Sequence, residues 1–186
     1  MNRGVGFALC AAVLFAGALF PPLDVKAAQA SAPPVVFRKT SWDDLIPPDW
    51  NPTAILEKLQ VGKHGDGDPR SDKALAALKD EWDMAPGNKA LDGRKVALEG
   101  YIVPLKADKK GAMTDMLLVP YFGACVHSPP PPANQIVHVV FDPGRKGFEM
   151  MMIVKVKGTL RLRDVSTLMG AAAYRLEASE IESLDE

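Results

Sequence analysis

The stretch Gly93–Leu105, GRKVALEGYIVPL, decides the fold. Its apolar side chains alternate, with Val96, Leu98 and Ile102 on one face, and a period of two residues predicts a β-strand. Gly100 interrupts the pattern, and a glycine inside a strand indicates a bulge or a sharp bend. A long strand that bends at a glycine can pair on both sides, which is how a small barrel closes.

Four further strands are expected after this stretch. Their segments are DMLLVPYF, QIVHVVF, MMIVKVKGTLRL and AAAYRLEASEIESL, at 115–122, 135–141, 151–162 and 171–184. The last segment begins with three alanines, which favour a helix, but Tyr174, Leu176 and Ala178 alternate and favour a strand. DPGRKG, residues 142–147, has the composition of a turn.

Five such strands predict a mainly β protein with small α additions. The expected architecture is an OB-like five-stranded barrel over residues 91–182, with a two-sheet sandwich as the alternative. An N-terminal arm, extended and helical, is expected over 31–90, and an acidic tail over 183–186.

The arm is expected to hold one or two helices. Asn51 can cap a first helix with Pro52 at its initial position, and SDKALAALKDEWDM, residues 71–84, has helical spacing of its apolar side chains. Trp42 and Trp50 flank a pair of prolines that blocks a helix. We expect the two tryptophans to anchor an extended segment on the barrel, because aromatic side chains bury large areas.

The first thirty residues are expected to be a signal peptide. Arg3 precedes an apolar run from Val5 to Phe20, and Ala28-Gln29-Ala30 fits a cleavage site before Ser31. An uncleaved N-terminal anchor is the alternative. The leader predicts export to a periplasm of the Gram-negative type, and no apolar run of membrane-spanning length follows it.

Charge is unevenly distributed although the formal net charge is only −1. Residues 94–163 carry an excess of Lys and Arg, and both flanking regions are acidic. The flanks can neutralise the middle, or the middle can present an anion-binding face. Nucleic acid is not expected as a partner, because the leader predicts export and the predicted strands carry few aromatic residues for base stacking.

Removal of the leader takes away Cys10 and leaves Cys125 as the only cysteine. Cys125 and His127 are two residues apart, so on an extended segment both side chains point the same way. His138 follows in the next strand. Thiolate and imidazole suit zinc and copper(I), so Cys125, His127 and His138 are candidate metal ligands.

The segment between these residues is stiff. Its four prolines favour a polyproline II conformation, which needs no internal hydrogen bonds. The two amides that follow can satisfy carbonyl groups of the loop or orient an imidazole. The motif loop consists of Pro129, Pro130, Pro131, Pro132, Asn134 and Gln135.

Two other interpretations of Cys125 remain open. His127 can lower the pKa of the thiol and make it a nucleophile or a redox group. Alternatively, Cys125 is buried as a small hydrophobic residue and His127 bonds to the proline loop, since free cysteines are among the most buried residues.

The chain resembles a bacterial exported family catalogued as domain-of-unknown-function family 3299. The resemblance covers about Ser41–Glu182 and rests on GRKVALEGYIVPL, LLVPYFGACVHSPPPPANQIVHV and GTLRL…GAAAYRLEA, with SWDDLIPPDW similar to the family's lead-in. It implies an OB-like barrel. The family motif falls on Cys125, His127, Pro129, Pro130, Pro131, Pro132, Asn134 and Gln135, while relatives are expected to carry an aromatic residue in place of His138.

The resemblance also implies an exported accessory protein that acts beside ABC-type envelope transporters and metal-homeostasis systems. We therefore expect a monomeric binding module of an envelope transport system. Binding of a transition metal through Cys125 and His127 is one function that such a module can have. A thiol-dependent enzyme or redox protein is the first alternative. The second is a protein-interaction module that docks through the proline-rich loop.

Overall fold

Strand β2 (Lys95–Ala107) organises the barrel, as its sequence pattern predicts. In the computed structural model, which describes residues 34–65, 67–124 and 130–185, β2 pairs along both edges. Its first half is antiparallel to β5 (Ile153–Thr167), and its second half is antiparallel to β3 (Met113–Val119). Tyr101 lies at the crossover, one residue after Gly100, and has a partner on each side.

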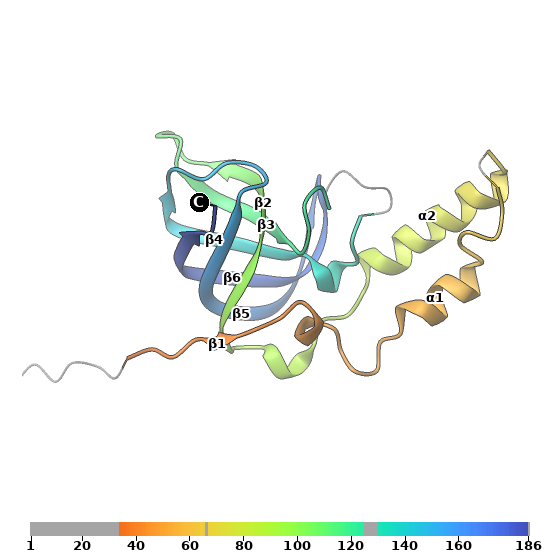
Figure 1. Ribbon diagram of the computed structural model, residues 1–186, viewed down its shortest axis with the longest axis horizontal. Helices are drawn as coiled ribbons and strands as arrows, with labels where there is room; N and C mark the ends of the chain where they lie inside the picture. The colour runs from red at the N-terminus through yellow and green to blue at the C-terminus, as the bar shows by residue number, and fades with distance from the viewer. Residues whose placement is uncertain (1–33, 66, 125–129, 186) are drawn as a thin grey trace, which may run out of the picture. The chain divides into compact units, whose positions relative to one another are not determined.

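The remaining pairings close the sheet. Strand β4 (Val137–Arg145) is antiparallel to β3 and parallel to β6 (Gly170–Ser183), and β6 is antiparallel to β5. The order β2-β3-β4-β6-β5 therefore returns to β2 (Figure 1). A closed barrel of five strands with this order is OB-like, which confirms the predicted fold class and rules out the two-sheet sandwich.

Two glycines are needed where strands approach closely. A Cβ atom at Gly100 would lie 2.7 Å from the carbonyl oxygen of Val119, and one at Gly158 would overlap the backbone of Glu177 and Ala178. Real Cβ atoms do not reach such distances, so either substitution requires the backbone to move. The mid-strand glycines are therefore explained by strand packing inside the barrel.

The barrel interior is filled by alternate side chains of all five strands. Its members are buried together and include Val96, Leu98, Ile102, Met116, Leu118, Val137, Val139, Val154, Val156, Leu160, Tyr174 and Leu176. A second apolar cluster consists of Val103, Leu117, Val119, Ala124, Ile136 and Ala172. On β2 and β3 the residues of this second cluster alternate along the strand with those that point into the barrel. The second cluster therefore lies on the outer side of these strands.

Two segments near the ends of β4 and β6 were ambiguous in sequence. The segment 142–147 is not simply a turn, because β4 continues to Arg145, which pairs with Met113 on β3. That pairing extends the β3–β4 ladder past the proline and glycine that suggested a turn. The last segment forms β6, a strand rather than a helix, as the alternation of its apolar side chains predicts.

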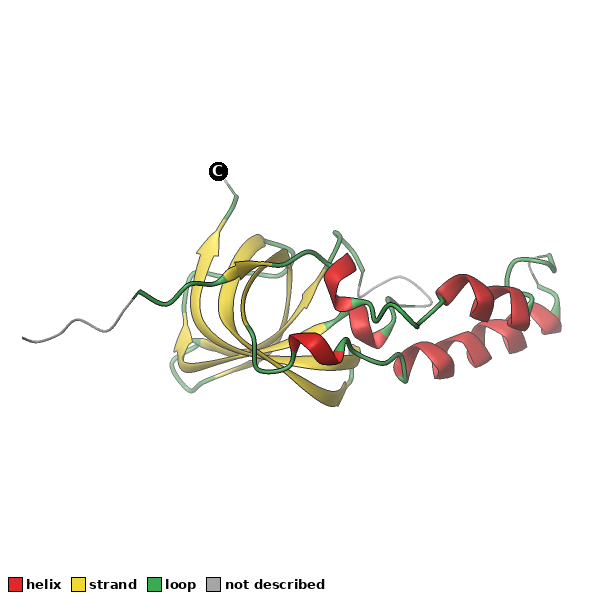
Figure 2. Ribbon diagram, turned by 90° about the horizontal axis from the view of Figure 1, so that it is seen from below, coloured by secondary structure: helices red, strands yellow, loops and turns green. Residues whose placement is uncertain are grey.

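The residues before the barrel form a short strand, β1 (Arg38–Lys39), and several helices. The α-helices are α1 (Pro52–Leu59) and α2 (Pro69–Asp83), which lie side by side (Figure 2). Asn51 caps α1 as predicted, whereas Asp68 caps α2. None of the helices in the described part of the chain is long and apolar enough to cross a membrane.

Hydrogen bonds to backbone groups fasten this N-terminal region to the barrel. The indole of Trp42 donates to the carbonyl of Glu99 on β2 at 2.8 Å. The buried hydroxyl of Tyr174 on β6 donates to the carbonyl of Leu45 at 2.6 Å and accepts from the backbone N–H of Asn88. Burial raises the pKa of Tyr174 to about 12, so this hydroxyl stays protonated and able to donate.

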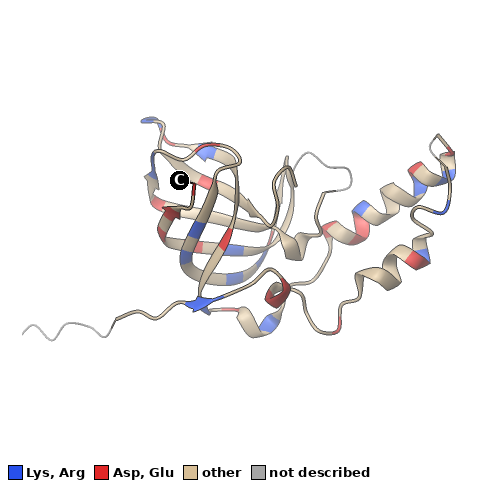
Figure 3. Cartoon of the chain, viewed as in Figure 1, with Lys and Arg blue, Asp and Glu red and all other residues tan. Residues whose placement is uncertain are grey.

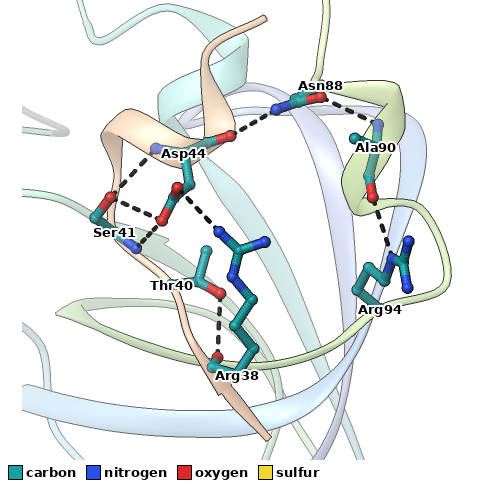
Figure 4. Close-up of polar contacts among 7 residues, drawn as sticks. All are labelled: Arg38, Thr40, Ser41, Asp44, Asn88, Ala90 and Arg94. Carbon is teal, nitrogen blue, oxygen red and sulfur yellow. Dashed lines mark hydrogen bonds and ion pairs between the residues drawn. The ribbon is translucent and has the colours of Figure 1, made fainter.

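A second group of polar contacts joins two parts of the arm (Figure 4). The side chain of Asn88 donates to the carbonyl of Asp44 and accepts from the backbone N–H of Ala90. Asp44 also accepts from Ser41 and pairs with Arg38. The hydrogen bonds from Ser41 lower the pKa of Asp44, so the carboxylate is charged over the ordinary pH range.

Candidate functional site

The motif loop is described from Pro130 onward. Cys125, His127 and Pro129 lie outside the described residues. Pro130, Pro131 and Pro132 lead into a short 3-10 helix, η3 (Ala133–Gln135), in which the N–H of Gln135 donates to the carbonyl of Pro132 at 2.7 Å.

The two amides of the motif bind the N-terminal arm. Asn134 is completely buried and donates to the carbonyl of Pro86 at 3.1 Å. Gln135 donates to the carbonyl of Trp42 at 2.9 Å and to the carbonyl of Asn134 at 3.1 Å. The motif therefore joins the start of β4 to two distant points of the arm, a structural role that the sequence did not reveal. One contact of Gln135 does satisfy a carbonyl of the loop itself, as predicted.

His138 lies on β4, on the outer side of the barrel opposite Leu117 of β3. Its side chain is only 9% exposed, and its Nε2 lies 3.1 Å from Oδ1 of Asp115. The other carboxylate oxygen, Oδ2, accepts from the hydroxyl of Thr114 at 2.9 Å. Nδ1 of His138 is buried and has no hydrogen-bond partner in the part of the chain that the structure describes.

Burial lowers the pKa of His138 below its ordinary value of 6.5. The hydrogen bond and the charge of Asp115 act in the opposite direction, while Arg175 and Lys106 lower the pKa further. The imidazole is therefore neutral at neutral pH. Because Asp115 can only accept when ionised, Nε2 carries the proton and Nδ1 is left as an acceptor.

A cavity of about 450 Å³ adjoins this pair. Leu105 and Lys106 of β2 form one wall, and the end of β5 with the β5–β6 turn forms another. The turn is held in shape by Thr167, whose hydroxyl donates to Gly170 and accepts from Met169. The full lining is Leu105, Lys106, Asp115, His138, Val165, Ser166, Thr167 and Leu168; we call this space the His138 cavity.

A second hollow, of about 460 Å³, adjoins the same turn. It is lined by Lys79, Asp83 and Met84 at the end of α2, by Pro130 of the motif loop, and by 166–171. Leu168 at the tip of the turn is fully exposed, and Met84 is 73% exposed. Pro130 lines the second hollow and His138 lines the first, and the two hollows share Ser166, Thr167 and Leu168 of the β5–β6 turn region.

The predicted metal ligands are only partly described. Within residues 34–65, 67–124 and 130–185, no three His, Cys, Asp or Glu side chains gather closely enough to hold a metal ion. His138 contacts Asp115, and whether Cys125 and His127 share a ligand stays a prediction. Sequence reasoning missed Asp115 and Lys106; the one signal for Asp115 was an acidic residue at the head of an apolar strand.

The fold and the site define a five-stranded OB-like barrel with an N-terminal arm and a cavity on its outer side. The chain belongs to the DUF3299 family, a family of unknown function whose model matches residues 42–183. It is similar to a DUF3299 family protein from Pseudomonas aeruginosa PAO1, known from a crystal structure. The identity is 35%, with a TM-score of 0.63, and the match covers 82% of this chain and 99% of the other. No curated protein matches the chain.

Proposed function

We propose that the protein is an exported, non-enzymatic binding module of the cell envelope and that it binds a small ligand in the His138 cavity. The observation that carries this proposal is the cavity itself, beside a buried histidine with an unpartnered acceptor atom among the described residues. A volume of about 450 Å³ is within the range of small-molecule sites. Buried polar atoms usually have partners, and the ring that carries this unpartnered Nδ1 belongs to a residue that lines the cavity.

The position of the cavity in the barrel supports the same function. OB barrels bind their ligands on the face of their second and third strands, between the first and the fourth inter-strand loops. Here those strands are β3 and β4, which carry Asp115 and His138, and the fourth loop is the β5–β6 turn. A fold alone does not assign a ligand, and the cavity found at this position supplies independent support.

Binding is favoured over catalysis by the contacts of His138. A hydroxyl nucleophile needs a base within hydrogen-bond reach. Ser166 lines the cavity, but the hydrogen bond of His138 goes to Asp115, and none joins His138 to Ser166. We propose export on the basis of the leader sequence. We propose action beside an envelope transporter on the basis of the family resemblance.

Native mass spectrometry of the full chain, secreted to a bacterial periplasm, tests the binding function. We expect a retained small molecule on the wild type that Ser166→Trp displaces, because the indole fills the cavity. Ser183→Trp is the control, since Ser183 is exposed near the end of β6, away from the cavity lining. Equal ligand retention by Ser166→Trp and the wild type, or no retention by any of the three proteins, contradicts the proposal.

Metal binding is a second candidate function, and one observation favours it. Metal-ligating histidines commonly donate their other ring N–H to a carboxylate, which is the relation of His138 to Asp115. Elemental analysis after zinc or copper(I) loading tests this function with Cys125→Ser, His127→Ala and His138→Ala. Stoichiometric metal that all three variants lose supports a shared site; metal content unchanged by them contradicts it.

A further inference from the structure

The charges around the His138 cavity form a row across four strands. Lys106 of β2 is opposite Asp115 of β3, and His138 of β4 is opposite Arg175 of β6. Asp115 and His138 are joined by their hydrogen bond. Neighbouring strands are about 4.8 Å apart, so the four side chains lie in succession on the outer side of the barrel.

The carboxylate in this row is already occupied. Asp115 accepts from His138 through one oxygen and from Thr114 through the other. Lys106 is the residue opposite Asp115, yet no ion pair forms between them. Across the described residues, neither Lys106 nor Arg175 makes a salt bridge, and Lys106 lines the His138 cavity, where it is available to a ligand.

Three cations of β5 are ion-paired. Lys155 contacts Glu99 at 3.1 Å, Lys157 contacts Glu180 at 2.7 Å, and Arg161 reaches Glu177 at 4.0 Å. Figure 3 shows the two signs of charge interleaved on the barrel strands. With a neutral His138, the cavity lining holds one positive charge, Lys106, and one negative charge, Asp115, whose two oxygens already accept hydrogen bonds; Arg175 lines a neighbouring hollow. A cation without an ion pair beside low-dielectric walls attracts anions.

The rest of the cavity is suited to an aliphatic group. Leu105, Val165 and Leu168 line it, and Leu168 is fully exposed. Ser166 is exposed on the same wall and has a hydroxyl to donate. A ligand that covers Leu168 removes apolar surface from water, which favours binding.

We propose, on the basis of the binding function above, that the ligand is a small amphiphile with a single negative charge. Its anionic head lies at Lys106 and Ser166, and its aliphatic body lies against Leu105, Val165 and Leu168. The head group and the apolar contact are both required, so neither a small inorganic anion nor a neutral chain binds as well.

Calorimetric titration with three probes of one chain length tests the charge preference. Octanoate, octanamide and octylammonium differ in head-group charge and have the same number of carbon atoms. We expect octanoate to bind at least about tenfold more tightly than octanamide at neutral pH, because a charge-assisted contact forms with Lys106. Octylammonium is expected not to bind. Equal affinity for octanoate and octanamide overturns the proposed ligand class.

The variant Lys106→Met keeps most of the side-chain volume and removes the charge. Octanoate affinity is expected to fall about tenfold, to the level of octanamide, while octanamide affinity is unchanged. Lys109→Met is the matched control, since it makes the same charge change in the adjacent turn, outside the cavity lining. An equal effect of Lys109→Met means that net charge alone governs binding and overturns the role of Lys106.

Ser166→Trp separates this inference from the proposed function. If octanoate and octanamide bind equally and Ser166→Trp blocks both, the cavity binds ligands but the preference for an anion is wrong. If no probe binds, or if Ser166→Trp has no effect on binding, both proposals fall.

Vesicles containing phosphatidylglycerol identify the source of the head group. If the protein sediments with the vesicles and octanoate prevents this, the anionic head group belongs to a lipid. If the protein binds octanoate but does not sediment with the vesicles, the head group belongs to a free molecule.

Discussion

The two outer sides of the barrel differ in how their polar groups are satisfied. On the β2–β5–β6 side, Lys155 and Lys157 each pair with a glutamate in contact with water. On the β2–β3–β4 side, an apolar cluster is buried, His138 is sealed against Asp115, and Lys106 has no ion pair with a described residue. The ion pairs on the first side need no ligand, whereas on the second side Lys106 has a charge that a ligand can pair with.

The largest expected effect tests the β5–β6 pairing that supports the ion-paired side. Gly158→Ala places a methyl group against the backbone of Glu177, where the two strands cannot separate without breaking the barrel. We expect the free energy of unfolding to fall by about 2–3 kcal/mol, measured by urea denaturation. Gly65→Ala is the control, because its Cβ meets no atom within 4 Å. A loss below about 0.5 kcal/mol for Gly158→Ala would show that the close approach is not required.

The next prediction compares one acidic residue from each side. Asp115→Asn and Glu99→Gln make the same change of charge, but only Asp115 partners a buried group. Asp115→Asn is expected to cost about 1–2 kcal/mol of unfolding free energy, because His138 loses a charged partner. Glu99→Gln is expected to cost less than about 0.5 kcal/mol. Equal costs for the two variants would remove the distinction between the sides.

Much of the barrel could be predicted from the chain, because its pattern is local. Alternating apolar residues located the strands, and Gly100 marked the point where β2 changes partner. The end of β4 was missed because the pairing of Arg145 with Met113 outweighs the turn propensity of the residues between Phe141 and Arg145.

The site was harder to predict because its contacts are long-range. Asp115 and His138 are 23 positions apart, and Gln135 reaches Trp42 over 93 positions. No local pattern reports such contacts. The predicted site at Cys125 and His127 lies outside the described residues and stays a prediction, while the cavity beside His138 became visible only when β2, β3, β4 and the β5–β6 turn were placed together.

A smaller effect is expected from pH, and it concerns His138. The pKa of His138 is lower in the folded chain than its ordinary value of 6.5, because burial disfavours the charged ring. As the pH falls below 6.5, His138 is therefore protonated in the unfolded chain before it is protonated in the folded chain. The free energy of unfolding decreases over this window, until the pH falls below the pKa of His138 in the folded chain. Chemical denaturation over this window should show a steeper loss for the wild type than for His138→Gln. Parallel curves would contradict a buried, neutral His138.

The smallest expected effect concerns the paired cations. Lys157 is bonded to Glu180 on the exposed side of the barrel, where salt screens such pairs. Lys157→Met should leave the urea midpoint almost unchanged and make it less sensitive to added salt. A large difference in urea midpoint between Lys157→Met and the wild type in high salt would contradict this prediction.

The most direct test of the account is an amide NMR titration of the protein with octanoate, followed residue by residue. We predict saturable shifts at Leu105, Lys106, His138 and Ser166, four of the residues that line the His138 cavity. Shifts confined to the strands that carry Lys155 and Lys157, or none at saturating octanoate, would contradict the claim that the β2–β3–β4 side carries the binding site.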